Sequence, residues 1–253
     1  MFAADSDFLR TMDRRSSQAG SEFIAADLLH MQQAPNYNNW MLSMILPHLG
    51  KRILEIGSGV GTMTTRLLER AEIVCALEPN PYCASRLKAD LDKDPRLAVI
   101  NKPLEECTAG ELSAYGFDTV LCCNVLEHIS DDLQALIMFR KILAGQKGKA
   151  IIWVPAVPLA YGSIDKAVGH YRRYSRGGIL ALVRAAGMQP IVSRYINLLG
   201  LLGWIVNSHV FHRVEQSNSQ IGLFNRLVPF LAKAEKLIPP PVGMSLLVVA
   251  EAK

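Results

Sequence analysis

The chain has 253 residues, of which 50% are hydrophobic and 20% are charged, a composition that favours a folded α/β domain and excludes wholesale disorder. Its formal net charge of +4, without a dense run of basic residues, gives no reason to expect nucleic acid as a partner. The five cysteines lack paired metal-ligand spacing and the N-terminal residues lack the apolar run of a signal peptide, so we expect reduced thiols and a cytoplasmic location.

Residues 1–49 predict an N-terminal helical cap, because apolar residues recur there at helical spacing on both sides of a break at Pro35. From residue 50 onward, short apolar runs alternate with helical segments, which is typical of βα units around a parallel sheet. We therefore expect a doubly wound α/β domain at 50–253. Its first five strands are expected at 52–56, 72–77, 97–101, 118–123 and 149–154, and its first four helices near 62–69, 81–92, 108–114 and 131–144.

The regular alternation stops at 155–175, which predicts an insert after the fifth strand. Ligands bind outside the carboxyl ends of the strands in open α/β sheets, so this insert is a candidate for function. Alternation resumes with a helix at 176–186, ended by Gly187, and a strand at 189–195. After a helical segment, a last strand is expected at 244–250.

The segment 196–240 is expected to be helical and is strongly apolar in places. Its most apolar run, 198–206, has about half of the ~20 residues needed to span a bilayer, so we expect no stable membrane insertion. Two interpretations of the apolar stretch 198–212 stay open. It is a lid, which would favour an apolar small-molecule substrate, or it packs on the core or forms the interface of a homodimer.

A glycine-rich turn follows the first expected strand, where Glu55 precedes the run Gly57-Ser58-Gly59-Val60-Gly61. Glycines allow a tight turn and a close approach of the backbone to a ligand. A dinucleotide site would have its third glycine where Thr62 stands, and an acid in the turn would repel a pyrophosphate. The same acid suits a ligand that carries a cationic amino-acid group.

A second acidic residue, Glu78, ends the next expected strand, roughly 20 residues after the turn, and is followed by Pro79. A carboxylate at this place accepts hydrogen bonds from ribose hydroxyls. Each acid alone is a weak signal, because acids end many strands. Together, with a strand, a turn and a helix in order, they indicate a nucleoside ligand with an amino-acid tail.

With these motifs the chain resembles the class I S-adenosylmethionine-dependent methyltransferase family over residues 36–251. The resemblance rests on 53–61 (ILEIGSGVG), on Glu78 and on 117–129 (FDTVLCCNVLEHI). It implies a Rossmann-like sheet of seven strands whose last strand is antiparallel. It also implies S-adenosylmethionine as the cofactor, with S-adenosylhomocysteine as the product.

The resemblance also implies cofactor contacts. Family members often have an aspartate after the third strand to hold the adenine; here Pro103 and Leu104 stand there, which implies only a backbone or packing contact. Tyr37 is a candidate for contact with the cofactor's carboxylate, and the open alternative is an aromatic side chain that fixes its helix to the sheet. The full set of expected cofactor contacts is Tyr37, Glu55, Gly57, Ser58, Gly59, Gly61, Glu78, Pro79, Leu104 and Asn124.

Two histidines are candidate general bases, since histidine titrates near working pH. His128 follows the fourth strand and His170 lies in the insert; otherwise each is a packing or hydrogen-bonding residue. A divalent-metal site at Asn124, Glu127 and His128 is a third interpretation. The relatives that hold such a metal have a carboxylate at the first of these positions, so we expect no metal here.

The insert contains the run Gly169-His170-Tyr171-Arg172-Arg173-Tyr174-Ser175. Its arginines could bind an anionic group through paired hydrogen bonds. The candidate substrate contacts are Tyr171 and Arg173 of this run, and Glu127 after the fourth strand. Alternatively, Ser175 caps the next helix and the arginines are solvated or paired with acids.

The sequence therefore predicts a methyltransferase that acts on a small molecule, an apolar one if 198–212 is a lid. Transfer to oxygen is favoured because the two candidate bases would then be useful. A nicotinamide-dependent oxidoreductase is an alternative that Glu55 and Thr62 both oppose. A non-catalytic scaffold that keeps the cofactor fold is the other, and the intact glycine turn and Glu78 oppose it.

Overall fold

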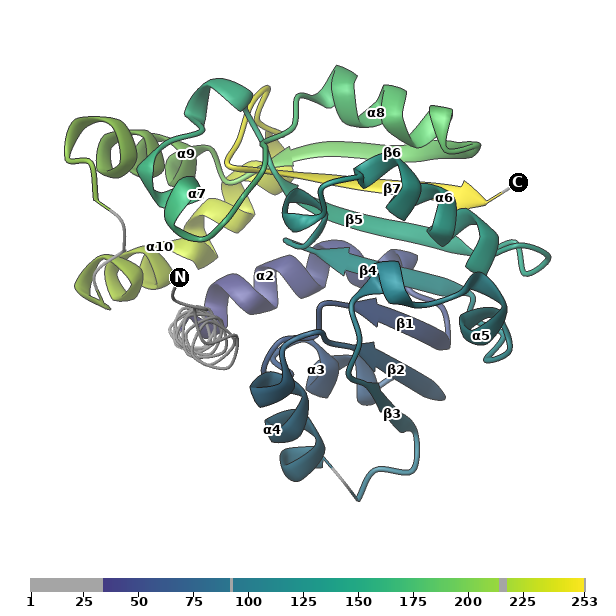
Figure 1. The fold of residues 1–253 in the computed structure, drawn as a ribbon. Coiled ribbons are helices and arrows are strands. Elements are labelled where there is room, and N and C mark those ends of the chain that lie inside the picture. Colours follow the sequence, from purple (N-terminus) through teal and green to yellow (C-terminus); the bar gives the residue numbers. More distant parts are fainter. Residues whose placement is uncertain (1–33, 92, 214–217, 253) are drawn as a thin grey trace, which may run out of the picture.

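The computed structural model describes residues 34–91, 93–213 and 218–252, so most of the expected N-terminal cap lies outside the described residues. Seven strands form one sheet in the order β3-β2-β1-β4-β5-β7-β6 (Figure 1). The strands are β1 (Arg52–Ile56), β2 (Ile73–Leu77), β3 (Leu97–Ile100), β4 (Thr119–Cys123), β5 (Lys149–Pro155), β6 (Met188–Ile196) and β7 (Ser245–Ala252).

Helices connect and cover these strands. The α-helices are α2 (Pro35–Ile45), α3 (Thr64–Leu68), α4 (Pro81–Leu91), α5 (Ala109–Ser113), α6 (Asp132–Ile142), α7 (Ser163–Ala167), α8 (Arg176–Ala185), α9 (Leu198–Ile205) and α10 (Asn218–Leu237). Single turns of 3₁₀-helix are η1 (Leu46–His48), η2 (Leu104–Glu106), η3 (Leu126–His128) and η4 (Pro158–Ala160), and η5 (Val206–Val210) is a π-helical turn.

Strand direction sets where the functional residues meet. β1 pairs in parallel with β2 and β4, and β4 pairs in parallel with β5, whereas β7 runs antiparallel to both β5 and β6. The expectation of a seven-stranded, mostly parallel sheet with an antiparallel last strand is therefore confirmed. The carboxyl ends of the parallel strands lie along one edge, where a Rossmann-like sheet binds its ligands.

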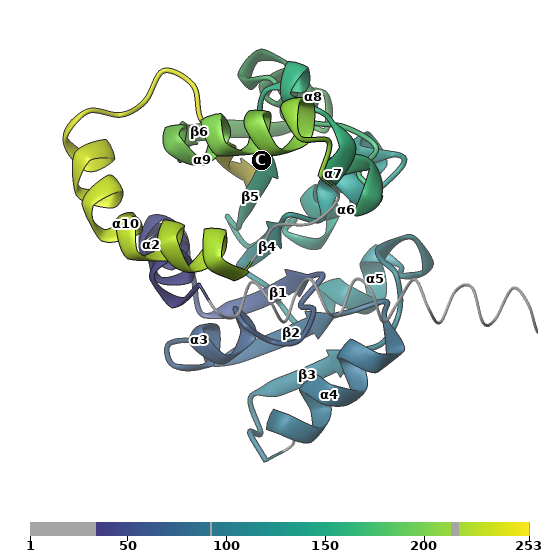
Figure 2. The ribbon, with the colours of Figure 1, turned by 90° about the vertical axis from the view of Figure 1, so that its left-hand side faces the viewer.

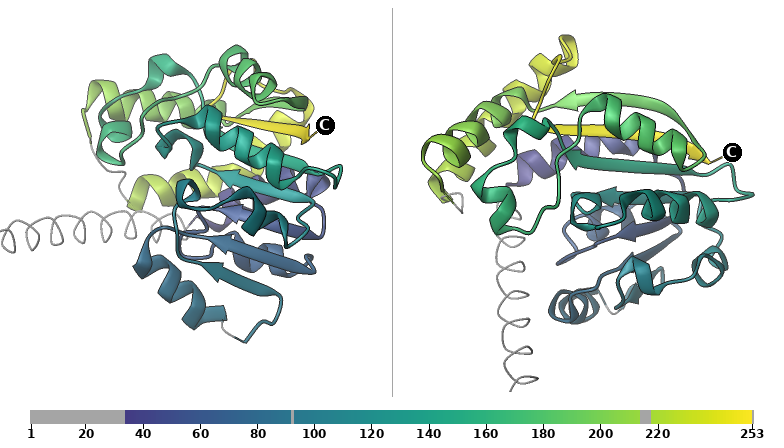
Figure 3. Two further views of the ribbon diagram at one scale, coloured as in Figure 1. Left: turned by 45° about the vertical axis from the view of Figure 1, so that its right-hand side comes forward. Right: turned by 45° about the horizontal axis from the view of Figure 1, so that its top comes forward.

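Helices cover both faces of the sheet (Figure 3), and a hydrophobic layer lies between helices and sheet on each face. On one face the core includes Phe139 of α6, Ile179 of α8 and Leu112 of α5. On the other face it includes Trp40 of α2, Leu67 of α3 and Val228 of α10. The central strands are buried on both sides, which explains why their sequences are continuous apolar runs without alternation.

The insert is more ordered than its sequence indicates. Residues 155–175 contain η4 and α7, and a parallel bridge between Ala156 and Tyr174 ties the insert back to the end of β5. Ser175 caps α8 by accepting a hydrogen bond from the amide of Gly178, as the capping interpretation expects. Helix α7 has no apolar repeat long enough to be found in advance, because it has only five residues.

The apolar segment after β6 divides into α9, η5 and α10, and these elements lie with α7 beyond the carboxyl edge of the sheet (Figure 2). Within the described residues, no helix combines the length and the hydropathy that crossing a bilayer requires. Helix α9 packs Leu201 and Trp204 against Ala160 and Ile164 of the insert, so it covers the insert.

Candidate active site

The glycine-rich turn leaves β1 with three glycines in the left-handed region, at φ of 68° for Gly57, 55° for Gly59 and 84° for Gly61. A side chain there would be strained, since this region disfavours residues with a β-carbon. Added β-carbons would also lie 2.4 Å from Val125 at Gly57 and 2.4 Å from Leu87 at Gly61. The turn is therefore packed closely from both sides, and Val125 brings η3 directly beside it.

The two candidate cofactor acids, Glu55 of β1 and Glu78 after β2, are buried and hydrogen-bonded. Glu78 accepts hydrogen bonds from the backbone amides of Gly59, at 2.6 Å, and Asn80, at 2.8 Å. Glu55 accepts one from the Thr64 hydroxyl at 2.6 Å. Burial raises the pKa of Glu78 and raises the pKa of Glu55 to about 8. Because carboxylate oxygens accept more than one hydrogen bond, Glu78 retains capacity for ribose hydroxyls.

The turn fits an S-adenosylmethionine-type ligand on one further observation. The Ser58 hydroxyl is buried and has no hydrogen-bond partner among the described residues. A buried unpaired hydroxyl is costly and indicates a missing partner. Ser58 belongs to the turn whose glycines bring the backbone close to a ligand, so an amino-acid tail bound there could satisfy it.

The remaining expected cofactor contacts lie at different depths. Asn124 follows β4 in a left-handed conformation and is exposed at the carboxyl edge, and Pro79 is exposed after β2. Leu104 is buried in the core, which agrees with a packing contact at most. Tyr37 is buried against Trp40 and Phe224, with ring centroids 6.4 and 5.9 Å away, so the structure places its ring as an aromatic contact that fixes α2.

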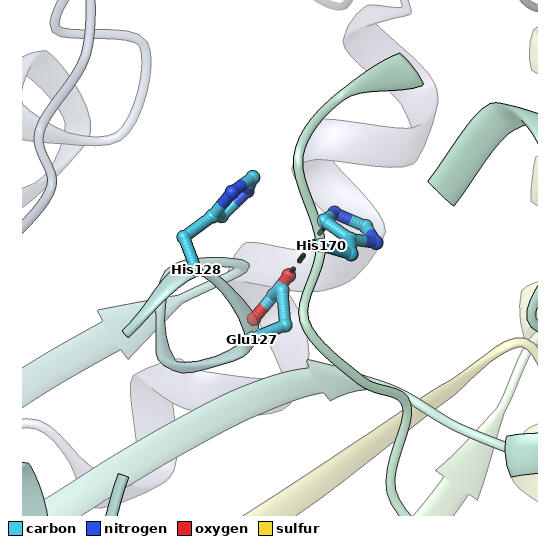
Figure 4. Close-up of side chains that lie close together, drawn as sticks. All are labelled: Glu127, His128 and His170. Atoms are coloured by element: carbon cyan, nitrogen blue, oxygen red, sulfur yellow. Dashed lines mark ion pairs between the residues drawn. The ribbon is translucent and has the colours of Figure 1, made fainter. Parts of the chain in front are cut away.

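A second cluster lies beside the turn, formed by Glu127 and His128 of η3 and by His170 of the insert (Figure 4). His170 Nε2 lies 3.8 Å from a carboxylate oxygen of Glu127. The two histidine rings meet edge to face with centroids 4.7 Å apart. The amide of Tyr171 donates a hydrogen bond to the carbonyl of Glu127, which fixes the insert to η3. Sequence positions about forty apart are thus held together.

Asp165 of α7 orients His170, since its carboxylate lies 2.8 Å from His170 Nδ1. The same carboxylate oxygen accepts a hydrogen bond from Arg173 Nε at 2.8 Å. With Nδ1–H donated to Asp165, the other ring nitrogen of His170 keeps a lone pair that points toward Glu127. The arrangement gives His170 the form of a base held in one tautomer.

Arg173 is buried inside this network. It also donates to the Ala156 carbonyl at 3.1 Å, and its guanidinium lies 4.4 Å from the centre of the Trp204 ring. Its ion pair with Asp165 agrees with the alternative interpretation of the insert, in which the arginines pair with acids of the protein. One guanidinium nitrogen, Nη2, is still buried without a partner among the described residues. Tyr171, the other candidate substrate contact of the insert, is exposed.

The electrostatics of the cluster have clear physical causes. Burial raises the pKa of Glu127 to about 8, and both of its carboxylate oxygens lack hydrogen-bond partners among the described residues. Burial alone would raise the pKa of Asp165, but hydrogen bonds and charge from His170 and Arg173 outweigh it and lower that pKa. His128 is exposed at the surface, yet desolvation by nearby atoms and then the charge of His170 lower its pKa.

The same three side chains could hold a divalent cation. Glu127, His128 and His170 each offer one ligand atom, and these atoms lie within 4.8 Å of one another. Asn124 is not part of this set, so the geometry differs from the metal site considered at Asn124, Glu127 and His128.

Sequence reasoning missed Asp165 and Trp204. Asp165 carries a usable signal, because it lies five residues before a candidate base in an insert at the ligand-binding edge. Trp204 carries none, since a tryptophan in an apolar helix is most simply a packing residue.

Residues 54–146 match the model of a methyltransferase domain. An uncharacterised methyltransferase of Mycobacterium tuberculosis is 29% identical over 119 residues, which cover 47% of this chain and 46% of the relative. A counterpart from Mycobacterium bovis matches equally. The chain thus spans about half the length of the curated relatives it matches.

Solved structures share the fold. A methyltransferase of Haloferax volcanii, solved with the Trm112 methyltransferase activator, has a TM-score of 0.62 at 14% identity and covers 92% of this chain and 97% of its own. The 1,6-didemethyltoxoflavin-N1-methyltransferase of Burkholderia thailandensis, solved with S-adenosylhomocysteine, has a TM-score of 0.55 at 18% identity, over 100% of this chain and 92% of its own. Residues 54–146 thus match a methyltransferase domain, and the whole sheet shares the fold of solved methyltransferases.

Proposed function

We propose that this chain transfers the methyl group of S-adenosylmethionine to an oxygen atom of an apolar small molecule. The observation that carries the proposal is the Asp165–His170 pair, held 3.8 Å from buried Glu127 on η3, whose neighbour Val125 packs on the glycine turn. A base beside a cofactor turn is most useful when the acceptor arrives as a protonated hydroxyl.

The cofactor half of the reaction needs few groups. Glu78 would accept ribose hydroxyls, Ser58 and the turn would bind the amino-acid tail, and Glu55 would face its cationic amino group. When bound, S-adenosylmethionine supplies an electrophilic methyl group on sulfur. The protein's main contribution is then to hold cofactor and acceptor in line, because orientation supplies much of the acceleration in methyl transfer.

The acceptor half needs a proton to leave the hydroxyl. His170 Nε2 would take it, and Asp165 would stabilise the resulting imidazolium and keep the ring oriented. Burial raises the pKa of Glu127 to about 8, and in its neutral form Glu127 would donate a hydrogen bond to the acceptor. His128 lies at the exposed side of the same cluster and is the second candidate base.

The apolar side chains of α9 that pack on the insert support an apolar acceptor. Leu201 and Trp204 of α9 pack with Ala160 and Ile164 there. Trp204 lies over Arg173, next to the Asp165–His170 pair, so an aromatic surface borders the polar groups. Such a boundary suits a molecule with one hydroxyl on an apolar body.

Calorimetry tests the cofactor assignment first. We expect micromolar binding of S-adenosylhomocysteine and no response to NADH. Preference for NADH would contradict the proposal and favour a nicotinamide-dependent oxidoreductase. No binding of either ligand would favour a non-catalytic scaffold.

A panel of apolar phenols and alcohols with radiolabelled S-adenosylmethionine tests the transfer. His170→Gln should lower kcat by about 10²- to 10⁴-fold without changing cofactor affinity. His48→Gln, a histidine of η1 outside the cluster, is the matched control. Activity that disappears on chelation and returns with a divalent cation would instead favour a metal held by Glu127, His128 and His170.

A further inference from the structure

Exposed apolar side chains concentrate on one part of the molecule. Of the sixteen large hydrophobic residues that are exposed among the described residues, eleven lie between 198 and 238. They are Leu198, Leu199, Leu202, Val206, Val210, Phe211, Leu223, Leu227, Phe230, Leu237 and Ile238. We refer to these side chains on α9, η5 and α10 as the α9–α10 surface. Clustered exposed apolar side chains mark a surface that meets an apolar partner.

Helix α10 carries its residues in three rows. Ile221, Val228 and Glu235 recur every seven residues, and all three are buried. Leu223, Phe230 and Leu237 also recur every seven residues and are 62%, 73% and 83% exposed. At about 100° per residue, the exposed row lies roughly 160° around the helix from the buried row. The exposed apolar residues are therefore a separate face that the protein's own core does not use.

A third row on α10 is cationic. Arg226 and Lys233 are exposed and also seven residues apart. Their row lies roughly 60° around the helix from the Leu223 row, on the side away from Leu227. Lys236 is exposed farther round on the same side, and Arg213 follows η5. The exposed apolar face is thus bordered by basic side chains.

The charge around this surface is of one sign within the described part of the segment 198–240. Its exposed charged side chains are Arg213, Arg226, Lys233 and Lys236. The acid there, Glu235, is buried and accepts hydrogen bonds from the amides of Asn197 and Leu198. A partner with an apolar interior and an anionic surface would complement such a face.

Helix α9 and η5 carry exposed apolar side chains of their own. Leu199, Leu202, Val206 and Val210 follow at intervals of three and four residues and are exposed, while Leu201 and Trp204 pack inward. A hydrogen bond of 3.1 Å from Gln220 to Asn207 links α10 to η5. Figure 2 shows that α9 and α10 both lie on the side of the carboxyl edge of the sheet.

We propose that the α9–α10 surface binds the face of a lipid bilayer that contains anionic lipids, with α10 lying along the membrane plane. Leucine and phenylalanine side chains would enter the boundary between headgroups and acyl chains, and Arg226, Lys233 and Lys236 would meet lipid phosphates. Helix α9 is too short and helix α10 is too charged to span a bilayer, so the attachment is peripheral. This inference does not rest on methyl transfer.

Vesicle flotation of the full chain tests the proposal, with phosphatidylcholine vesicles made with and without phosphatidylglycerol. We expect flotation that requires phosphatidylglycerol and weakens as salt rises, because exposed charge interactions are screened. Phe230→Ser should reduce partitioning by about ten-fold, because it removes a large apolar side chain from the interface. Tyr82→Ser, an exposed aromatic on α4, is the matched control and should leave partitioning unchanged.

Replacement of Arg226, Lys233 and Lys236 by glutamine should reduce partitioning roughly 100-fold, at about five-fold per charge. The same replacement at Lys88, Lys93 and Lys102, which are exposed elsewhere, should have little effect. Failure of the unmodified chain to float, or equal flotation of Phe230→Ser, would overturn the proposal. A dimer in sedimentation velocity that Phe230→Ser dissociates, without vesicle binding, would overturn it in favour of self-association.

Discussion

The two halves of the sheet hold their ligand-facing groups in different ways. Around β1 and β2, the candidate cofactor groups come from one turn and one strand end, and backbone amides bind the key carboxylate. Around β5, the candidate acceptor groups come from η3, α7 and the loop that follows it, and side chains bind one another through Asp165. The first half depends on backbone shape, and the second depends on a network of side chains.

This difference explains how each half tolerates change. A turn with glycines at positive φ admits few substitutions, since any side chain is strained. A side-chain network can exchange members as long as each buried polar group keeps a partner. We infer that the β1–β2 half fixes the cofactor, and the insert adapts the fold to one acceptor. Substitutions in the two halves should therefore separate in the quantity that they affect.

The largest effect is expected at Glu78. Glu78→Ala should weaken binding of S-adenosylhomocysteine by about 2–4 kcal/mol, because two hydrogen bonds to a charged acceptor are lost. Calorimetry measures the change, and Glu72→Ala, an exposed acid just before β2, is the control. Unchanged affinity would mean that Glu78 does not bind the ribose. It would also contradict the assignment of cofactor binding to the β1–β2 half.

A smaller effect, on folding, is expected at Gly57. Gly57→Ala should lower the free energy of unfolding by roughly 2–3 kcal/mol, from left-handed strain and from the 2.4 Å approach to Val125. Urea denaturation measures it. Gly177→Ala is the control, because an added β-carbon there meets nothing within 4 Å. Equal stability of the two variants would mean that the turn is not constrained by its backbone.

The insert half is tested by Asp165→Asn. The variant should lower kcat by roughly 10- to 100-fold and leave cofactor affinity unchanged, because it disturbs the orientation of His170. The pH profile of kcat should also move, which loss of packing alone would not cause. Asp132→Asn is the control, since Asp132 pairs with Arg172 and Tyr174 of the same insert without touching His170. A fall in cofactor affinity alone would contradict the division between the halves.

The sequence predicts the first half well because its signals are local. Strand β1 lies at the expected residues, β2 begins one residue later than expected, and the glycines of the turn have the positive φ of a tight turn. Each of these features depends on neighbours within a few residues. Only the resemblance to the methyltransferase family predicts that the last strand is antiparallel, because an apolar run does not indicate the direction of a strand.

The second half could be found only in part. His128 and His170 were both candidates, yet nothing in the sequence brings the two rings to 4.7 Å, because that contact depends on how the insert folds back to η3. Arg173 could equally have met a ligand or an acid of the protein. Arg173 pairs with Asp165, which lies on a helix of five residues. This helix is too short to give a periodic signal in the sequence.

The last effect is on the pH dependence of stability and concerns Glu55. Because burial raises the pKa of Glu55 to about 8, the folded cofactor-free chain binds a proton there that the unfolded chain releases above its ordinary pKa of 4.5. Its stabilising contribution is complete below about pH 4.5 and is lost as pH rises toward 8. The free energy of unfolding should therefore fall with rising pH in this window, by at most about 1.4 kcal/mol per pH unit from this group. Urea denaturation of Glu55→Gln at several pH values should give a flatter profile than the unmodified chain. A profile that rises through the window, or one that Glu55→Gln leaves unchanged, would mean that Glu55 is ionised in the folded turn.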